Sequence, residues 1–274
     1  MPTYAAELEA AREACLAAGA IIRTHYEAGP VAATRKADDS PVTAADLEAN
    51  DAILALLRAR FAGDAILSEE TTDDRTRLGR ARVWIVDPLD GTRDFVARTG
   101  DFAVHVGLSV DGRPAVGAVY QPVGDRLFWA ARGAGAFVRD GAGERRLRVS
   151  EQSELRLARV AVTRLARTDE LARFLEATGL GERAENIGAS IKMMALAEGR
   201  CEVSICLHGR EKEWDTCAPE IIVTEAGGVV TDLDGAPFAY NRPAVAHARG
   251  ILMTNGPLHD TLAALARPYL ESWT

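Results

Sequence analysis

The feature that most constrains this chain is an apolar run at residues 83–86 that leads directly into the sequence Asp-Pro-Leu-Asp-Gly-Thr at residues 87–92. Consecutive apolar residues predict a buried strand, and the proline and glycine that follow predict its end. Asp87 and Asp90 are therefore expected close together, where two carboxylates repel each other unless protons or cations separate them. Carboxylate and carbonyl oxygens are hard ligands that suit magnesium or manganese.

The same turn has the composition of a phosphate site. The Leu89 carbonyl lies between the two aspartates in the sequence and offers a third oxygen ligand. Gly91 removes a side chain, so that backbone N–H groups can approach an anion, and Thr92 begins a predicted short helix whose N-terminus attracts phosphate. The segment thus predicts a cradle with cations on one side and N–H groups on the other. A turn with aspartates at its corners is the structural alternative.

Three more acidic segments need an explanation. Asp46 lies near the start of a predicted helix, Glu69 and Glu70 follow a predicted strand at residues 65–67, and Asp215 precedes another helix. Because α/β sheets place ligand chemistry at strand ends, we expect these segments to converge on the aspartate turn. Each also has a structural explanation: a capping box for Asp46, a solvated loop for the two glutamates, and a helix N-cap for Asp215.

Hydrophobic periodicity divides the chain into two halves. Helical spacing predicts helices at residues 4–26 and 44–61, and period-two runs with turn residues between them predict an antiparallel meander. From residue 160 onward, strands alternate with helices, which is typical of an α/β fold. We therefore expect an α/β (α+β) protein with an N-terminal subdomain at residues 1–145 and a C-terminal subdomain at residues 146–274. The predicted meander strands lie at residues 102–110, 115–121, 126–131 and 136–139.

Composition sets limits on partners and location. The 274 residues carry a net charge of −8 and are 47% apolar, which argues against a nucleic-acid or anionic-membrane binder. The sequence shows no signal peptide and no apolar run long enough to span a membrane. The cysteines form no C-x-x-C pair, which favours reduced thiols in a cytoplasmic protein; they are Cys15, Cys201, Cys206 and Cys217.

The acidic segments occur in a recognisable order. Residues 65–70 read Ala-Ile-Leu-Ser-Glu-Glu, residues 84–92 read Trp-Ile-Val-Asp-Pro-Leu-Asp-Gly-Thr, and residues 213–216 read Glu-Trp-Asp-Thr. In this order the chain resembles the inositol monophosphatase superfamily of magnesium-dependent, lithium-sensitive phosphatases, over nearly its whole length. The resemblance implies a layered αβαβα sugar-phosphatase fold, two or three Mg²⁺ ions as cofactor and a small phosphorylated substrate.

The resemblance also implies roles for individual residues. Asp46 and Thr92 would orient and deprotonate the attacking water, and Gly91 and Thr92 would offer backbone N–H groups to the phosphate. The ions would lower the pKa of the water that attacks phosphorus in line, and they would make the local field positive in an acidic protein. The implied metal ligands are Glu69, Asp87, the Leu89 carbonyl, Asp90 and Asp215.

Within the superfamily, the chain is most similar to the CysQ-type 3'(2'),5'-bisphosphate nucleotidases. Residues 214–220 read Trp-Asp-Thr-Cys-Ala-Pro-Glu, and residues 187–192 place Lys192 near a helix start, where it could meet a second phosphate. A solvated surface lysine is the alternative. Residues 163–166 keep Arg164 but lack the Ser-His pair expected there. This branch implies removal of the 3'-phosphate of 3'-phosphoadenosine 5'-phosphate, with substrate contacts from Leu89, Asp90, Gly91, Thr92, Arg164, Lys192 and Asp215.

Other functions stay open at this level. An inositol-1-monophosphatase or broad-specificity sugar phosphatase would use the same metal site, whereas a binding module would keep the metal site only for structure. His208, Arg210 and Lys212 either serve the substrate or form a solvated basic loop, and His105 is expected to lie on a sheet face. A homodimer is left open, because the sequence gives no route to the oligomeric state.

Overall fold

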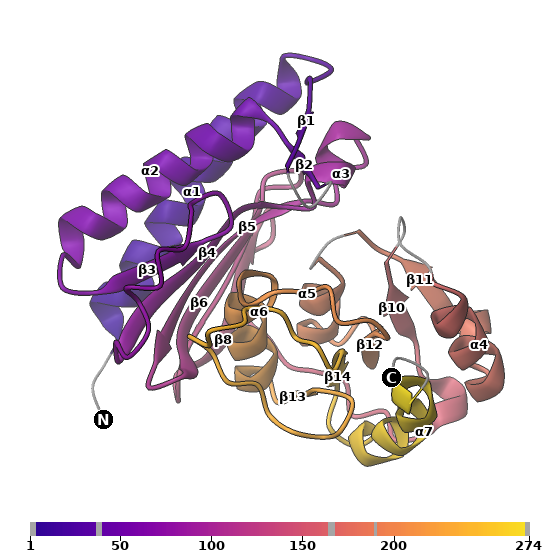
Figure 1. Ribbon diagram of the computed structural model, residues 1–274. Helices are drawn as coiled ribbons and strands as arrows, with labels where there is room; N and C mark the ends of the chain where they lie inside the picture. The colour runs from indigo at the N-terminus through magenta and orange to yellow at the C-terminus, as the bar shows by residue number, and fades with distance from the viewer. Residues whose placement is uncertain (1–3, 37–39, 164–167, 189–190, 272–274) are drawn as a thin grey trace.

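The computed structural model describes residues 4–36, 40–163, 168–188 and 191–271. Its elements stack as alternating helical and sheet layers, with α1 and α2 on one outer side and α4 and α7 on the other (Figure 1). The order is helices, a seven-stranded sheet, helices, a five-stranded sheet and helices again. This confirms the layered αβαβα fold expected from the sequence.

The first half of the chain builds the larger sheet and its outer helices. Helix α1 (Ala5–Glu27) buries Cys15, Ala18 and Ile22 at helical spacing and packs with α2 (Ala44–Arg60) on one sheet face. Strands β3 and β4 are parallel, and every later neighbour is antiparallel. In order across the sheet, the strands are β3 (Ala65–Ser68), β4 (Arg82–Asp90), β5 (Ala103–Val110), β6 (Arg113–Gln121), β7 (Arg126–Ala131), β8 (Gly135–Asp140) and β9 (Gly143–Arg146).

The second half builds the smaller, mixed sheet. Strand β10 is parallel to both its neighbours, whereas β14 is antiparallel to both of its own. Helices α4 (Asp169–Thr178) and α7 (His259–Glu271) cover its outer face. In order across the sheet, the strands are β11 (Ala184–Asn186), β10 (Val160–Val162), β12 (Val203–Cys206), β14 (Ile251–Thr254) and β13 (Val229–Thr231).

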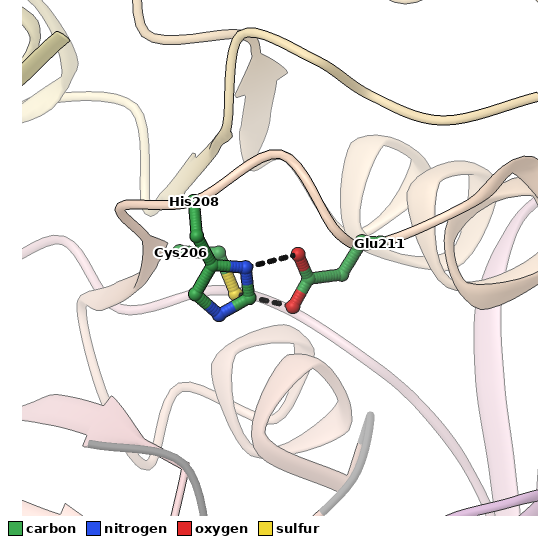
Figure 2. Close-up of side chains that lie close together, drawn as sticks. All are labelled: Cys206, His208 and Glu211. Carbon is green, nitrogen blue, oxygen red and sulfur yellow. Dashed lines mark hydrogen bonds and ion pairs between the residues drawn. The ribbon is translucent and has the colours of Figure 1, made fainter. Parts of the chain in front are cut away.

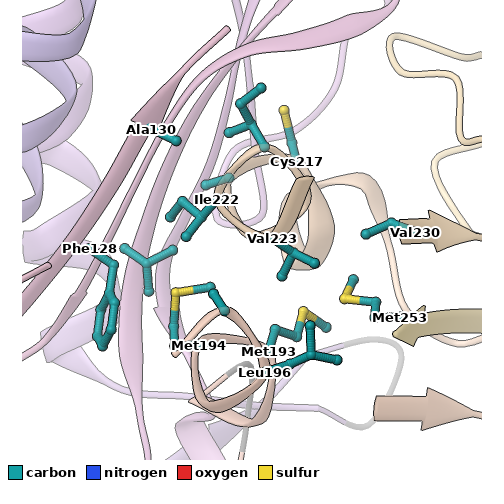
Figure 3. Close-up of a cluster of buried hydrophobic side chains, with 14 of the residues drawn as sticks. Phe128, Ala130, Met193, Met194, Leu196, Cys217, Ile222, Val223, Val230 and Met253 are labelled. Atoms are coloured by element: carbon teal, nitrogen blue, oxygen red, sulfur yellow. The ribbon is translucent and has the colours of Figure 1, made fainter. Parts of the chain in front are cut away.

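The central helical layer determines where the functional helix lies. Helices α5 (Ile191–Ala197) and α6 (Glu213–Glu225) lie between the sheets, in a core that includes Phe128, Met194 and Ile222 (Figure 3). Gly107 and Gly117 are paired across β5 and β6 and face α6. A Cβ atom at Gly117 would lie 2.6 Å from the Ala218 carbonyl oxygen, so larger residues there would push α6 away from the sheet.

Several element boundaries differ from those expected. Strand β4 does not end at residue 86 but continues to Asp90, with a shift of register between Asp87 and Asp90. A β-bulge absorbs the proline while the ladder to β5 continues. Helix α6 begins at Glu213 rather than at residue 216. The sequence also missed short elements: β9, β11, the hairpin of β1 (Thr34–Arg35) and β2 (Pro41–Val42), and two 3₁₀ turns, Leu155–Leu157 and Leu180–Arg183.

Two further expectations concern the whole chain. All four cysteines are buried and unpaired, as the absence of paired spacing predicted. In the part of the chain that the structure describes, no helix is both long and apolar enough to cross a bilayer. The central core contains residues from both sides of residue 145, so the division into subdomains at this position stays a prediction.

Candidate active site

The acidic segments converge on one cavity between the two halves. Carboxylate oxygens of Asp87, Asp90 and Asp215 lie within 4.8 Å of one another. They border a cavity of about 290 Å³. Eight of the predicted site residues line this cavity: Glu69, Asp87, Leu89, Asp90, Gly91, Thr92, Lys192 and Asp215.

The bulge in β4 and the start of α3 (Thr92–Val96) shape the floor of the cavity. The Leu89 N–H donates to Asp87 Oδ1 at 3.0 Å, which fixes the turn between the two aspartates. Gly91 precedes the helix with a φ of 87°, a left-handed conformation that favours glycine. The glycine is therefore required by the backbone as well as by the space that an anion needs.

Thr92 and Asp46 form a buried hydrogen-bonded pair beside the cavity. The Thr92 hydroxyl donates to Asp46 Oδ1 at 2.9 Å and also lies 3.2 Å from the Leu89 carbonyl oxygen. The other oxygen of Asp46 accepts from the Thr43 N–H at 2.8 Å and from the Thr43 hydroxyl at 2.6 Å. The capping box expected as a structural alternative is thus present, and the same carboxylate also contacts Thr92. Burial raises the pKa of Asp46 above its ordinary value.

Glu69 and Glu70 are not a solvated loop. Lys36 Nζ lies 2.7 Å from Glu69 Oε1 and 2.5 Å from Glu70 Oε1, and the Glu70 side chain is only 5% exposed. Burial raises the pKa of Glu70 to about 7. Sequence reasoning did not single out Lys36, although it is one of two basic residues in the polar stretch that precedes residue 41. Glu69, which lines the cavity, is thus paired with Lys36.

The aspartates fit a divalent cation on electrostatic grounds. Burial raises the pKa of Asp87 well above its ordinary range, and the charges of Glu69, Asp90 and Asp215 raise it further. Burial likewise raises the pKa of Asp215, together with the charges of Asp90 and Glu69. Such a group binds either protons or cations, and its oxygen donors suit Mg²⁺. Asp215 is the third residue of α6, and its Oδ2 accepts the Lys212 N–H at 2.6 Å; it is not the N-cap residue.

Basic side chains also line the cavity. Lys192, at the start of α5, is 5% exposed, so the alternative of a solvated surface lysine is wrong. Burial lowers its pKa, but the surrounding negative groups, including Glu211 and Asp90, raise it, and the net shift is upward. Thr163, Arg210 and Glu211 line the same cavity as Lys192. Arg164 lies outside the described residues.

The structure gives His105 a place that its sequence pattern did not reveal. His105 is on a sheet face as expected, but it is fully buried and its Nε2 lies 3.6 Å from Asp90 Oδ2. Its Nδ1 lies 3.3 Å from the Trp214 carbonyl oxygen, on the helix that carries Asp215. The pairing of Asp87 with His105 across β4 and β5 causes this placement. Pairing the two predicted strands in register would have placed His105 beside the aspartates, because residues opposite one another share a sheet face.

A carboxylate cluster that borders a cavity with basic side chains fits a metal-dependent phosphatase. The model of the inositol monophosphatase family matches residues 4–271. The chain therefore belongs to the inositol monophosphatase family. This family consists of metal-dependent phosphatases that act on small phosphorylated substrates, which agrees with the acidic cluster in the cavity.

Relatives within the family differ in their named substrates. The chain is 36% identical to the 3'(2'),5'-bisphosphate nucleotidase CysQ of Salmonella typhimurium, over 82% of this chain and 89% of that protein. It is 37% identical to the histidinol-phosphatase of Mycobacterium tuberculosis, over 88% and 90%. The crystal structure of CysQ from Bacteroides thetaiotaomicron superposes with a TM-score of 0.79 at 31% identity, covering 91% of this chain and 97% of that one.

Proposed function

We propose that this chain is a magnesium-dependent phosphomonoester hydrolase that removes the 3'-phosphate of 3'-phosphoadenosine 5'-phosphate. The observation that carries the proposal is a single cavity that is lined both by the aspartate cluster and by Lys192 and Arg210. The aspartate cluster suits the metal ions of phosphate hydrolysis, and the cations suit a second phosphate that is not hydrolysed. The similarity to CysQ proteins supports the same substrate.

Five groups would hold the ions. When bound, Mg²⁺ supplies Lewis-acid chemistry, since it polarises phosphate oxygens and lowers the pKa of water. The residues around the cluster keep these ligands in position: the Leu89 N–H orients Asp87, and the Lys212 N–H orients Asp215. Inhibition by Li⁺ is expected from the family resemblance. The proposed ligands are Glu69, Asp87, the Leu89 carbonyl oxygen, Asp90 and Asp215.

Thr92 and Asp46 would position the attacking water and accept its proton. Because the Thr92 hydroxyl donates its own proton to Asp46, its lone pairs are available to accept a hydrogen bond from water. Thr43 holds Asp46 in place through two hydrogen bonds. A proton leaving the water can pass to Thr92 as Thr92 releases its own to Asp46.

The C-terminal part of the chain would select the substrate. Residues 1–145 carry most of the proposed metal ligands, whereas residues 146–274 carry Asp215, Lys192 and Arg210. A buried ammonium group forms stronger charge-assisted hydrogen bonds than an exposed one, because the local dielectric is lower. Lys192 therefore has the environment required to bind a 5'-phosphate, and Arg210 can add a bidentate contact.

A second candidate substrate is histidinol phosphate. Glu211 lines the same cavity as Lys192, and its carboxylate can bind the amine or imidazolium of that substrate. Burial raises the pKa of Glu211, but His208 and Lys192 lower it, and the net shift is downward. The group is therefore charged at neutral pH. The histidinol-phosphatase relative gives this alternative its support.

The test is phosphate release with Mg²⁺ at equal low concentrations of four substrates. These are 3'-phosphoadenosine 5'-phosphate, histidinol phosphate, inositol 1-phosphate and fructose 1,6-bisphosphate, with the Asp90→Asn variant as the blank. A preference of about a hundredfold or more for the nucleotide, or about 3 kcal/mol, supports the proposal. Preference for histidinol phosphate supports the second candidate, and a flat profile rejects both in favour of a broad-specificity phosphatase.

A further inference from the structure

A second group of ligand-type side chains lies next to the cavity, on the segment between β12 and α6. Cys206 is the last residue of β12, and His208 and Glu211 follow in the loop that leads to α6. One ligand atom from each of the three lies within 4.8 Å of the others. Figure 2 shows the three side chains pointing toward one another. None of them belongs to the aspartate cluster.

The contacts within this group are close and shielded from solvent. Cys206 Sγ donates to Glu211 Oε1 at 3.0 Å, and His208 Nδ1 lies 3.0 Å from Glu211 Oε2. Cys206 is 5% exposed, and the side chains of His208 and Glu211 are 20% and 17% exposed. Both Nδ1 and Oε2 are buried, and their contact lacks hydrogen-bond direction. An imidazole nitrogen and a carboxylate oxygen placed this close can both act as ligands of one ion.

We propose that Cys206, His208 and Glu211 bind a divalent transition metal, with Zn²⁺ as the expected ion. Thiolate, imidazole and carboxylate are the three ligand types of protein zinc, whereas a thiolate is a poor ligand for Mg²⁺. In a tetrahedral zinc site the donor atoms are about 3.3–3.7 Å apart. The two observed contacts of 3.0 Å reach different oxygens of Glu211, and the three ligand atoms lie within 4.8 Å of one another, so the side chains must shift to bind one ion.

Unlike the aspartate cluster, the proposed site contains a thiol, which must lose its proton when a metal ion binds. Burial and the Glu211 charge raise the pKa of the Cys206 thiol well above its ordinary value, so the thiol is protonated before the ion binds. Binding breaks the S–H bond, forms a sulfur–metal bond and releases the proton to solvent. Three protein ligands leave a fourth position for water.

The position of the site links it to the phosphatase cavity. Glu211 belongs to the cavity wall, and the same loop continues to Asp215. The charges of Glu211 and Lys192 also interact. An ion at Glu211 would therefore lie beside Lys192 and would fix the loop that leads to α6.

Co²⁺ titration in the presence of excess Mg²⁺ tests the proposal, because Mg²⁺ occupies the aspartate cluster. The expected result is a thiolate-to-cobalt charge-transfer band in the near ultraviolet that saturates at one Co²⁺ per chain and disappears when Zn²⁺ is added. Cys206→Ser should abolish the band. Cys201→Ser is the matched control, because it alters another buried cysteine and should keep the band.

Two further variants keep the test decisive if Cys206→Ser does not fold. His208→Gln should weaken Co²⁺ binding at least about tenfold, and Asp90→Asn should leave the band unchanged, since it alters only the aspartate cluster. No band in the natural protein would overturn the proposal. A band that survives in Cys206→Ser, or that is lost in Asp90→Asn, would overturn it equally.

Discussion

Two sets of buried carboxylates lie on or beside helix α6, and they differ in what compensates their charge. Glu213 accepts the Asn241 N–H at 2.7 Å and the Arg242 N–H at 2.9 Å, and Glu220 accepts the Tyr240 hydroxyl at 2.6 Å. Asp87 and Asp215 each accept one backbone N–H, and burial together with the charges of neighbouring carboxylates raises their pKa values.

The difference separates structural carboxylates from functional ones. A buried charge is tolerated when protein donors or a proton satisfy it, and Glu213 and Glu220 meet that condition. Asp87 and Asp215 do not, because the protein gathers like charges where it could have placed donors. Such an arrangement requires protons or cations between the carboxylates, and its place in the cavity makes the aspartate cluster, rather than another buried acid, the candidate site.

The largest effect should come from removing one charge of the cluster. Asp90→Asn should lower kcat/KM for the preferred phosphate ester by roughly a thousandfold or more, because metal ligation contributes several kcal/mol to the transition state. The fold should survive, and thermal stability without Mg²⁺ should not fall, since the charge of Asp90 raises the pKa of Asp87. Phosphate release and a thermal melt measure the two results.

Asp111→Asn is the matched control for that experiment. Asp111 is an exposed turn residue of the same sheet, with a φ of 53° that asparagine accepts readily. It should change neither activity nor melting temperature. Full activity in Asp90→Asn would show that the cluster is a structural feature like Glu213, and the comparison would fail.

A smaller loss is expected at the water-positioning pair. Thr92→Val removes the hydroxyl that donates to Asp46 and should lower kcat by about a hundredfold, which is typical of general base catalysis. KM should change little, because the backbone N–H of residue 92 remains. Thr92→Ser restores the hydroxyl and should recover most of the rate. Unchanged turnover in Thr92→Val would exclude the proposed role.

Lys192 should affect which substrate is preferred more than the rate of phosphate hydrolysis. Lys192→Met should lower the preference for 3'-phosphoadenosine 5'-phosphate over inositol 1-phosphate by about ten- to a hundredfold, the effect of one charge-assisted hydrogen bond. Competition of the two substrates in one assay measures the ratio. Equal loss of both activities would mean that Lys192 supports the cluster instead of the second phosphate.

The acidic part of the site was accessible to sequence analysis because its residues are close together in the chain or follow strands. The aspartate turn, Glu69 and Asp215 are recognisable as motifs, and the layered fold followed from periodicity and resemblance. The contacts of Lys36 and His105 were not accessible, because each depends on a pairing between distant segments. The extension of β4 was missed for a similar reason: the ladder to β5, not local propensity, carries the strand through Pro88.

Burial could not be predicted at single charged positions either. A lysine in the first helical turn is usually solvated, but the packing of α5 between two sheets buries Lys192. The sequence predicts a strand that contains Cys206 and, after it, a basic loop with His208; only the three-dimensional structure brings the thiol, the imidazole and the Glu211 carboxylate together. Sequence patterns identify which residues can carry chemistry, whereas tertiary packing decides which of them do.

The smallest effect concerns Glu220, whose buried carboxylate should be neutralised by a proton and not by a metal ion. Burial raises its pKa from 4.5 to about 7. Because the folded state holds this proton more tightly than the unfolded chain does, the free energy of unfolding should fall as pH rises from 4.5 to 7, by on the order of 3 kcal/mol. The stabilisation is complete below the unfolded pKa and is lost as pH passes the folded one.

Glu220→Gln should remove that pH dependence, because the amide stays neutral and can still accept the Tyr240 hydroxyl. Urea unfolding at pH 5, 6 and 7 gives the free energy of unfolding of both proteins. The difference between them measures the contribution of Glu220, because groups that titrate elsewhere contribute equally to both. Mg²⁺ should leave the difference between the two proteins unchanged, since an ion in the aspartate cluster does not replace the Glu220 proton. If Mg²⁺ changes the difference between the two proteins, Glu220 and the aspartate cluster titrate as one system. The distinction between carboxylates neutralised by a proton and carboxylates neutralised by an ion would then not hold along α6.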